Sequence, residues 1–250
     1  MLTLHDYQPS LNGWKVRVLL GLLGVAYRGR EVALFRGEAR SEAFLKLNPN
    51  AKVPVIVDPD GPGGKPYTVI ESGAILLYLA EKTGKLLSKD MAAKYDAIQW
   101  LMTQMSTVGP MFGQYVHFLR FAPAGNDYSK SRYLTQATRV ATVIDQRLAQ
   151  ADYLAGTEYS VADIATFPWT RNHDTQGVKW EDNPNLARWF KAIDERPAVK
   201  AALAKVGAIK SNRDTANDDQ KDRFFNRGRY ARAYSSRFPG EAAREEPLAR

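Results

Sequence analysis

The sequence contains no cysteine in its 250 residues. Disulfide bonds, cysteine-ligated zinc, iron–sulfur clusters and a cysteine nucleophile are therefore excluded. Any thiol chemistry must use a thiol that arrives with a ligand. Histidine is scarce as well, because only His5, His117 and His173 occur, and no two of them have the i, i+4 spacing of a helical metal site. We expect no metal site.

Long hydrophobic runs are also missing. No stretch of about 18 apolar residues occurs, so we predict neither a membrane-spanning helix nor a membrane partner. The first residues, MLTLHDY, lack the basic region, apolar core and cleavage site of a secretory signal, which favours the cytoplasm. A content of 44% hydrophobic and 25% charged residues is typical of a folded globular chain, and the length suits two small domains or one large one.

The formal net charge is +8, but the lysines and arginines are spread along the chain. Their densest cluster is RFFNRGRYARAYSSRF, residues 223–238. One interpretation of this cluster is a solvated, partly disordered extension, and the other is a tail that binds a polyanion. For the rest of the chain, nucleic acid is not an expected partner.

Up to about residue 88 the sequence alternates between strand patterns and helix patterns. The expected strands are LTLHDY, YRGREVAL, VPVIVD and YTVIE, and the expected helices are NGWKVRVLLGLLG, SEAFLKLNP and ESGAILLYLAEKTG. The turn-rich stretch PDGPGGKP predicts a hairpin between the last two strands. The first two strands should be parallel and the hairpin antiparallel. This order predicts an α/β thioredoxin-like domain.

From residue 91 onward, strand patterns disappear and helix patterns follow one another. We expect a kink at Gly109-Pro110, a helix N-cap with an acidic partner at Ser160-x-x-Asp163 and a helix break at Arg196-Pro197. One long helix should bury an apolar face made of Leu134, Val140, Val143, Ile144 and Leu148. The predicted organisation is a thioredoxin-like domain over 1–88, an all-helical domain over 91–206 and a basic extension over 207–250.

The stretch SLNGWKV begins the first expected helix. A helix N-terminus offers unpaired N–H groups and the positive end of a dipole, which favour an anion such as a thiolate. Ser10 and Asn12 could add a hydroxyl and an amide to this site. The alternative is that both residues only cap the helix.

Two further motifs each allow a ligand-binding interpretation and a purely structural one. In NAKVPVIV, a cis Val53-Pro54 bond would turn the Val53 backbone toward an extended ligand, and the alternative is a trans proline on an edge strand. In ESGAIL, Ser72 at a helix start could receive a carboxylate while Glu71 pairs with an ammonium, and the alternative is again capping.

These motifs, S-x-N-G-x-K, N-x-K-V-P and E-S-G-A-I-x-x-Y-L-A-E, followed by an all-helical half, resemble those of cytosolic glutathione transferases. The resemblance runs from about residue 2 to residue 206. Within that family NGWKV, NAKVPVIVD, ESGAILLYLAEKTG and GPMFGQYVHF are similar to the bacterial Nu class, whose members resemble disulfide-bond reductases. The Nu-class pattern T-P-N-G is replaced here by S-L-N-G, which leaves open whether Ser10 or Asn12 leads.

The resemblance implies a role for each matching position. Asn12 would lie closest to the glutathione sulfur, and Ser10 would be a second donor to it. The remaining glutathione contacts would come from Lys52 to the glycyl carboxylate, Val53 with cis Pro54 to the cysteinyl backbone, and Glu71 with Ser72 to the γ-glutamyl end. Gln114 and Arg132 are candidates in the helical domain for contacts to a ligand or a partner subunit. Tyr7 competes for the sulfur, although the end of an alternating strand usually buries its aromatic residue.

The implied function is a glutathione transferase, and within it glutathione-dependent disulfide reduction. Glutathione would be the cosubstrate, a small disulfide or electrophile the substrate, and the protein a homodimer. One alternative is glutathione-dependent cleavage of aryl ethers or thioethers, with a second apolar site from Phe112, Tyr115, Phe118, Phe167 and Trp169, which could equally be core. The other is a non-catalytic glutathione-binding regulatory protein, which the basic tail favours.

Overall fold

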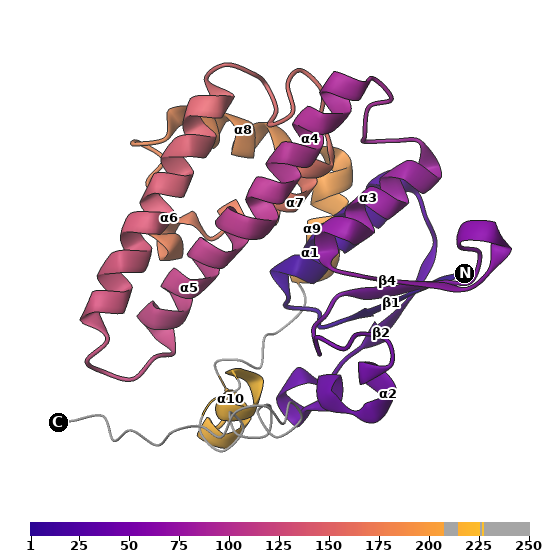
Figure 1. Ribbon diagram of the computed structural model, residues 1–250. Helices are drawn as coiled ribbons and strands as arrows, with labels where there is room; N and C mark the ends of the chain where they lie inside the picture. The colour runs from indigo at the N-terminus through magenta and orange to yellow at the C-terminus, as the bar shows by residue number, and fades with distance from the viewer. Residues whose placement is uncertain (208–214, 226, 228–250) are drawn as a thin grey trace. The chain divides into compact units, whose positions relative to one another are not determined.

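The computed structural model describes residues 1–207, 215–225 and 227 (Figure 1). By its contacts the chain divides into two compact units. The larger contains the described residues within 1–31 and 52–210, and the smaller those within 32–51 and 211–250. The predicted boundaries at residues 88, 91 and 206 follow a different division of the chain and stay a prediction.

The larger unit begins with a four-stranded mixed sheet in the order β2-β1-β3-β4. Its strands are β1 (Leu2–Asp6), β2 (Tyr27–Glu31), β3 (Val55–Asp58) and β4 (Tyr67–Ile70). β1 pairs with β2 in parallel, whereas β3 pairs with both β1 and β4 in antiparallel fashion. The predicted parallel pair and the predicted hairpin are therefore confirmed.

Two helices that pack against each other accompany the sheet (Figure 1). α1 (Leu11–Leu23) follows β1, and α3 (Ser72–Thr83) follows β4. Each ends at a glycine in the left-handed conformation, Gly24 and Gly84, as the sequence predicts. The mixed sheet with these helices is the predicted thioredoxin-like arrangement.

A helical region follows the sheet in the same unit. Its elements are α4 (Met91–Thr103), a π-helical segment (Gln104–Val108), α5 (Gly109–Arg120), α6 (Asp127–Leu148), α7 (Val161–Thr170), α8 (Pro184–Asp194) and α9 (Pro197–Gly207). Where the sequence predicts a kink at Gly109-Pro110, the π-helical segment directly precedes these residues. The predicted break at Arg196-Pro197 is confirmed by the start of α9.

One hydrophobic core runs through the larger unit, from Leu4 in the sheet to Trp189 on α8. The predicted N-cap is a capping box, in which the Asp163 carboxylate accepts from the Ser160 backbone N–H at 2.9 Å. The same carboxylate accepts from the Trp189 indole N–H at 2.9 Å and so joins α7 to α8.

The predicted apolar face of α6 is only partly correct. Val140, Ile144 and Leu148 are buried, but Leu134 and Val143 are each 38% exposed. Ala137 and Ala141 are buried in the core instead, because the packed face of α6 is rotated toward its small residues. Large apolar side chains alone therefore misplace the centre of this face.

The smaller unit contains two short 3₁₀ turns (Leu34–Arg36 and Glu38–Arg40), α2 (Glu42–Leu45) and α10 (Asp218–Phe225). Ser41 caps α2 through its hydroxyl, which accepts from the Phe44 backbone N–H at 3.2 Å. Phe224 of α10 stacks on buried Phe35, with ring centroids 4.5 Å apart.

Part of the predicted basic extension is thus a helix packed on the residues that precede β3. Arg223 Nη1 donates to the Arg36 carbonyl at 3.1 Å, and Arg40 Nη2 donates to the Arg223 carbonyl at 3.0 Å. Most of the basic cluster 223–238 lies outside the described residues, so both interpretations of it stay predictions.

Candidate active site

The start of α1 contains the two predicted sulfur-binding residues. Ser10 is the N-cap, and its hydroxyl accepts a hydrogen bond from the Gly13 backbone N–H at 3.3 Å. Asn12 is half-buried, and its amide has no hydrogen-bond partner among the described residues. The two side chains therefore differ: Ser10 caps the helix, whereas the Asn12 amide remains available to a ligand.

A buried carboxylate holds this helix start against the sheet. Asp6, at the end of β1, accepts from the Tyr7 backbone N–H at 2.8 Å and lies 3.1 Å from Arg17 Nε. A Cβ atom on Gly13 would lie 2.0 Å from Asp6 Oδ1, so this position requires glycine. Burial raises the pKa of Asp6 to about 7, although the Arg17 charge acts in the opposite direction. Tyr7 itself is buried, as expected for its place at the strand end.

The register of the sheet places the motif around Pro54 and the motif around Glu71 at the end of the sheet where α1 begins. Val55 is paired with His5 of β1 on one side and with Ile70 of β4 on the other. The residue before it, Pro54, therefore lies level with the residues that lead into α1 and α3. The Val53-Pro54 peptide bond is cis, as the sequence predicts.

The start of α3 has an unusual backbone. Glu71, the N-cap residue, has φ 65° and ψ 120°, although it is not glycine, and its side chain makes no capping hydrogen bond. Positive φ at such a residue is a strained conformation, and such strain clusters at ligand-binding sites. Ser72 is buried, and its hydroxyl lies 3.4 Å from Lys15 Nζ on α1. The alternative interpretation, in which Ser72 caps α3, therefore fails.

Comparisons with known proteins agree with this geometry. Residues 9–82 match the model of the glutathione S-transferase N-terminal domain, and residues 108–197 match that of the C-terminal domain. The disulfide-bond oxidoreductase YfcG of Escherichia coli K12 is 39% identical over 201 residues, which are 80% of this chain and 94% of that protein. This chain belongs to the glutathione S-transferase family.

Two solved structures are similar to this glutathione S-transferase. A glutathione transferase from Burkholderia graminis, with two glutathione molecules bound per subunit, is 42% identical with a TM-score of 0.75, over 81% of this chain and 87% of that one. A glutathione transferase from Pseudomonas putida, with one glutathione disulfide bound per subunit, is 40% identical with a TM-score of 0.76, over 81% and 90% of the chains.

The remaining predicted site residues of this glutathione S-transferase are exposed at the surface. Lys52 precedes Val53 and is exposed. Gln114 on α5 and Arg132 on α6 are also exposed, and no described hydrogen bond or ion pair joins them to the motif residues at the sheet edge. Their roles stay predictions.

The five aromatic residues of the alternative apolar second site differ in burial. Phe112 and Phe167 are 0% and 1% exposed and belong to the core, so they cannot line a substrate pocket. Tyr115, Phe118 and Trp169 are half-buried. An aryl-binding site built from all five aromatic residues is therefore excluded.

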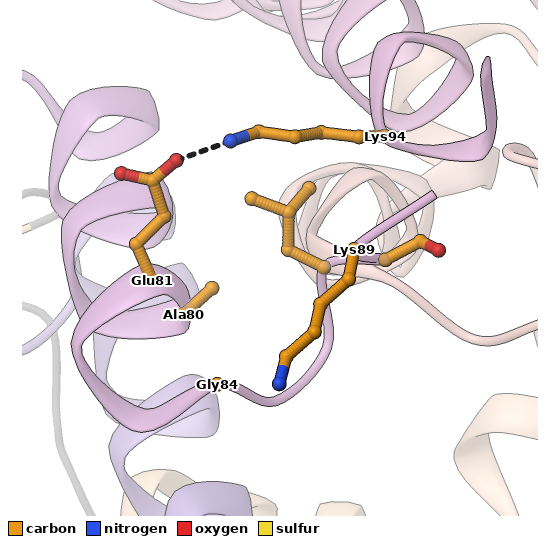
Figure 2. Close-up of a pocket in the computed structure, with 7 residues that line it drawn as sticks. Ala80, Glu81, Gly84, Lys89 and Lys94 are labelled. Atoms are coloured by element: carbon orange, nitrogen blue, oxygen red, sulfur yellow. Dashed lines mark hydrogen bonds and ion pairs between the residues drawn. The ribbon is translucent and has the colours of Figure 1, made fainter. Parts of the chain in front are cut away.

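Two surface cavities lie elsewhere in this glutathione S-transferase, around the segment that joins α3 to α4. Figure 2 shows the smaller, of about 290 Å³, where Lys94 and Glu81 form an ion pair of 2.6 Å across its rim. The larger, of about 520 Å³, extends from the same segment to Thr157 and Ser160. None of the predicted site residues lines either cavity.

Sequence reasoning did not single out Lys15, although it is the lysine of the S-x-N-G-x-K motif. It is 1% exposed, and the π-helical segment supplies its partner, Gln104. The available signal was a charged residue within the buried face of α1, beside Val16 and Leu19.

Among the described residues no helix is long and apolar enough to cross a membrane, and no cluster of side chains could hold a metal ion.

Proposed function

We propose that this glutathione S-transferase reduces disulfide bonds with glutathione as its cosubstrate. The observation that carries the proposal is the start of α1, where Ser10 caps the helix and the Asn12 amide has no partner in the described part of the chain. The name of the relative YfcG, a disulfide-bond oxidoreductase, supports the same reaction. So does the glutathione disulfide in the Pseudomonas putida structure.

The proposed role of the helix start is to favour the thiolate form of glutathione. A free thiol has a pKa of about 8.5, so only about 3% is ionised at pH 7. A pKa of about 6.5 would make roughly three quarters of it thiolate. The Asn12 amide, together with the helix N–H groups and dipole, supplies this stabilisation without a base on the protein.

The reaction uses two glutathione thiols, because the chain has no cysteine. The first thiolate attacks one sulfur of the substrate disulfide, whose S–S bond breaks, and the leaving thiolate takes up a proton. The second glutathione thiolate then attacks the glutathione sulfur of the resulting mixed disulfide. The products are two substrate thiols and one glutathione disulfide, which balances the atoms and electrons.

The rest of glutathione would extend along the end of the sheet. In this proposal the Val53 backbone binds the cysteinyl unit and Lys52 the glycyl carboxylate, while Glu71 and Ser72 hold the γ-glutamyl end. Gln114 and Arg132 are proposed to contact a second ligand or a partner subunit. The two glutathiones per subunit in the Burkholderia graminis structure support a site for a second ligand.

The test is glutathione-dependent reduction of a small dialkyl disulfide by the wild type and by Asn12→Ala. Loss of the amide should remove about 1–3 kcal/mol of thiolate stabilisation, because hydrogen bonds to charged groups have this strength. We expect kcat to fall by more than the affinity for glutathione. Equal losses in kcat and affinity would contradict a thiolate role.

Ser10→Ala is the matched comparison for Asn12→Ala. Because the Ser10 hydroxyl is used by Gly13, this variant should lose helix capping and retain most of the turnover. A larger loss of turnover in Ser10→Ala than in Asn12→Ala would assign the sulfur to Ser10. Absence of turnover in the wild type, with glutathione still bound, would reject the reductase.

We also propose that the protein is a cytoplasmic homodimer. The side chains of Met91, Tyr95 and Met102 share one face of α4 and are 72%, 53% and 45% exposed, which suits an apolar subunit contact. The cytosolic glutathione pool would supply the reductant. Tyr95→Glu should shift the protein from dimer to monomer in sedimentation, and a monomeric wild type would reject the dimer.

A further inference from the structure

Lys15 points from α1 into the interior of the larger unit. Its Nζ lies 2.6 Å from Gln104 Oε1 and 3.4 Å from Ser72 Oγ. Met105 Sδ lies 3.6 Å away, and the centroid of the Trp169 ring 5.8 Å away. Three separate elements, α3, the π-helical segment and α7, therefore surround one ammonium group.

A lysine in this position is costly unless the charge has a use. Lysines are almost never fully buried without a partner, yet no carboxylate forms an ion pair with Lys15 in the described part of the chain. Burial lowers the pKa of Lys15 to about 7, and the charge of Glu71 acts against this shift. The stability of the fold alone gives no reason for a cation here, because an apolar side chain would fill the space without this cost.

The surroundings of Lys15 are built closely around it. Gln104 is 0% exposed and directs its Oε1 at the ammonium, whereas its Nε2 has no partner among the described residues. A Cβ atom on Gly73 would lie 3.0 Å from Met105 Cγ, and one on Gly109 would lie 3.2 Å from Gln104 Nε2. The two glycines thus let the π-helical segment approach α3 and present Gln104 to Lys15. π-helical segments often occur at functional sites.

We propose that Lys15 is a positioning residue of the γ-glutamyl subsite, where it acts through Ser72 on the α-carboxylate of glutathione. This inference rests on the proposed function. The ammonium donates to the Ser72 oxygen, so the Ser72 hydroxyl hydrogen is left to donate elsewhere. Its present acceptor is Met105 Sδ at 3.6 Å, a weak one that a carboxylate would replace.

The buried charge would then act in two ways. It polarises the Ser72 hydroxyl, which becomes a stronger donor to an anion. It also adds a positive charge behind the N-terminus of α3, where the helix dipole already favours a carboxylate. Because the ammonium is buried, salt and water screen it less than a surface lysine.

The test couples a change in the protein to a change in the ligand. S-methylglutathione is one probe, because it has no free thiol and leaves the sulfur chemistry out of the measurement. The other is S-methylated 4-aminobutanoyl-cysteinylglycine, which lacks only the α-carboxylate of the γ-glutamyl unit. Calorimetric dissociation constants for both are measured with the wild type and with Lys15→Met.

We expect Lys15→Met to weaken S-methylglutathione about 10-fold, a typical loss for a removed charge-assisted contact. The probe without the α-carboxylate should change by less than about 2-fold, because the group that senses Lys15 is absent. Equal weakening of both probes would mean that Lys15 only supports the packing of α1, and would overturn the inference. Unchanged binding of S-methylglutathione would overturn it as well.

Two further variants complete the design. Lys65→Met removes an exposed lysine of the β3–β4 hairpin and should leave both dissociation constants unchanged, which controls for net charge. Lys15→Gln replaces Lys15→Met if the latter does not fold, with the same expected pattern. Failure of the wild type to bind S-methylglutathione would reject the proposed function itself, whereas binding without coupling to Lys15 rejects only this inference.

Discussion

The two helices that start at the same edge of the sheet, α1 and α3, use serine in opposite ways. Ser10 lies at the N-cap of α1 and accepts from the Gly13 backbone N–H, so its hydroxyl serves the helix. Ser72 is the first residue of α3, but its hydroxyl lies 3.4 Å from Lys15 Nζ. The same residue type at a helix start can thus cap its own helix or accept from a side chain of another helix.

The largest expected effect concerns Lys15, the partner of the Ser72 hydroxyl, and is a pH dependence of the free energy of unfolding. Its pKa is about 7 in the folded state and 10.5 ordinarily, so its contribution to the free energy of unfolding is present above pH 10.5 and lost as the pH falls through about 7. Between pH 7 and pH 10, the free energy of unfolding of the wild type should rise by on the order of 3 kcal/mol relative to that of Lys15→Met.

Denaturant unfolding of both proteins at several pH values measures this difference. Glu71 is the neighbouring charged group that acts on Lys15, and its charge opposes the lowering of the Lys15 pKa. A difference between the two proteins that does not vary with pH would show that Lys15 is not a buried cation.

The next effect compares the glycines at the two helix starts. A Cβ atom on Gly13 would lie 2.0 Å from the Asp6 carboxylate, which Tyr7 and Arg17 hold in place, whereas one on Gly73 would lie 3.0 Å from Met105 Cγ, so the Met105 side chain needs to shift by only a few tenths of an ångström. Gly13→Ala should lower the free energy of unfolding by about 3 kcal/mol, and Gly73→Ala by less than about 1 kcal/mol. Equal losses in thermal or denaturant unfolding would show that the Asp6 contact does not constrain α1.

The smallest effect compares the serines directly. Ser10→Ala should lower the free energy of unfolding by about 1 kcal/mol, the usual cost of a lost N-cap. Ser72→Ala removes no cap, because the Ser72 hydroxyl accepts from Lys15 instead, and it should raise the KM for glutathione more than it lowers kcat. An unchanged KM in Ser72→Ala would remove the distinction between the two helix starts.

Local patterns in the sequence were enough to predict the order of elements. The caps at Ser10, Ser41 and Ser160 and the glycine stops at Gly24 and Gly84 are decided by a few neighbouring residues. The sheet pairing followed from the connections between strands.

What the sequence did not predict depends on residues far apart along the chain. The burial of Lys15 depends on Ser72 and Gln104, which are 57 and 89 positions away. The π-helical segment at Gln104–Val108 has no local signature beyond the nearby Gly109-Pro110, which indicated only a kink. The contact of α10 with Phe35 also needs the tertiary structure, because Phe35 and Phe224 are far apart in the sequence.

In the proposed mechanism, the start of α1 stabilises a glutathione thiolate through Asn12. The most direct measurement is the thiol pKa of bound glutathione, followed by the ultraviolet absorbance of the thiolate across a pH titration of the wild type and of Asn12→Ala. We expect a pKa of about 6.5 in the wild type and a value about one unit higher in the variant. A bound thiol that titrates near about 8.5 in both proteins, as free glutathione does, would contradict it.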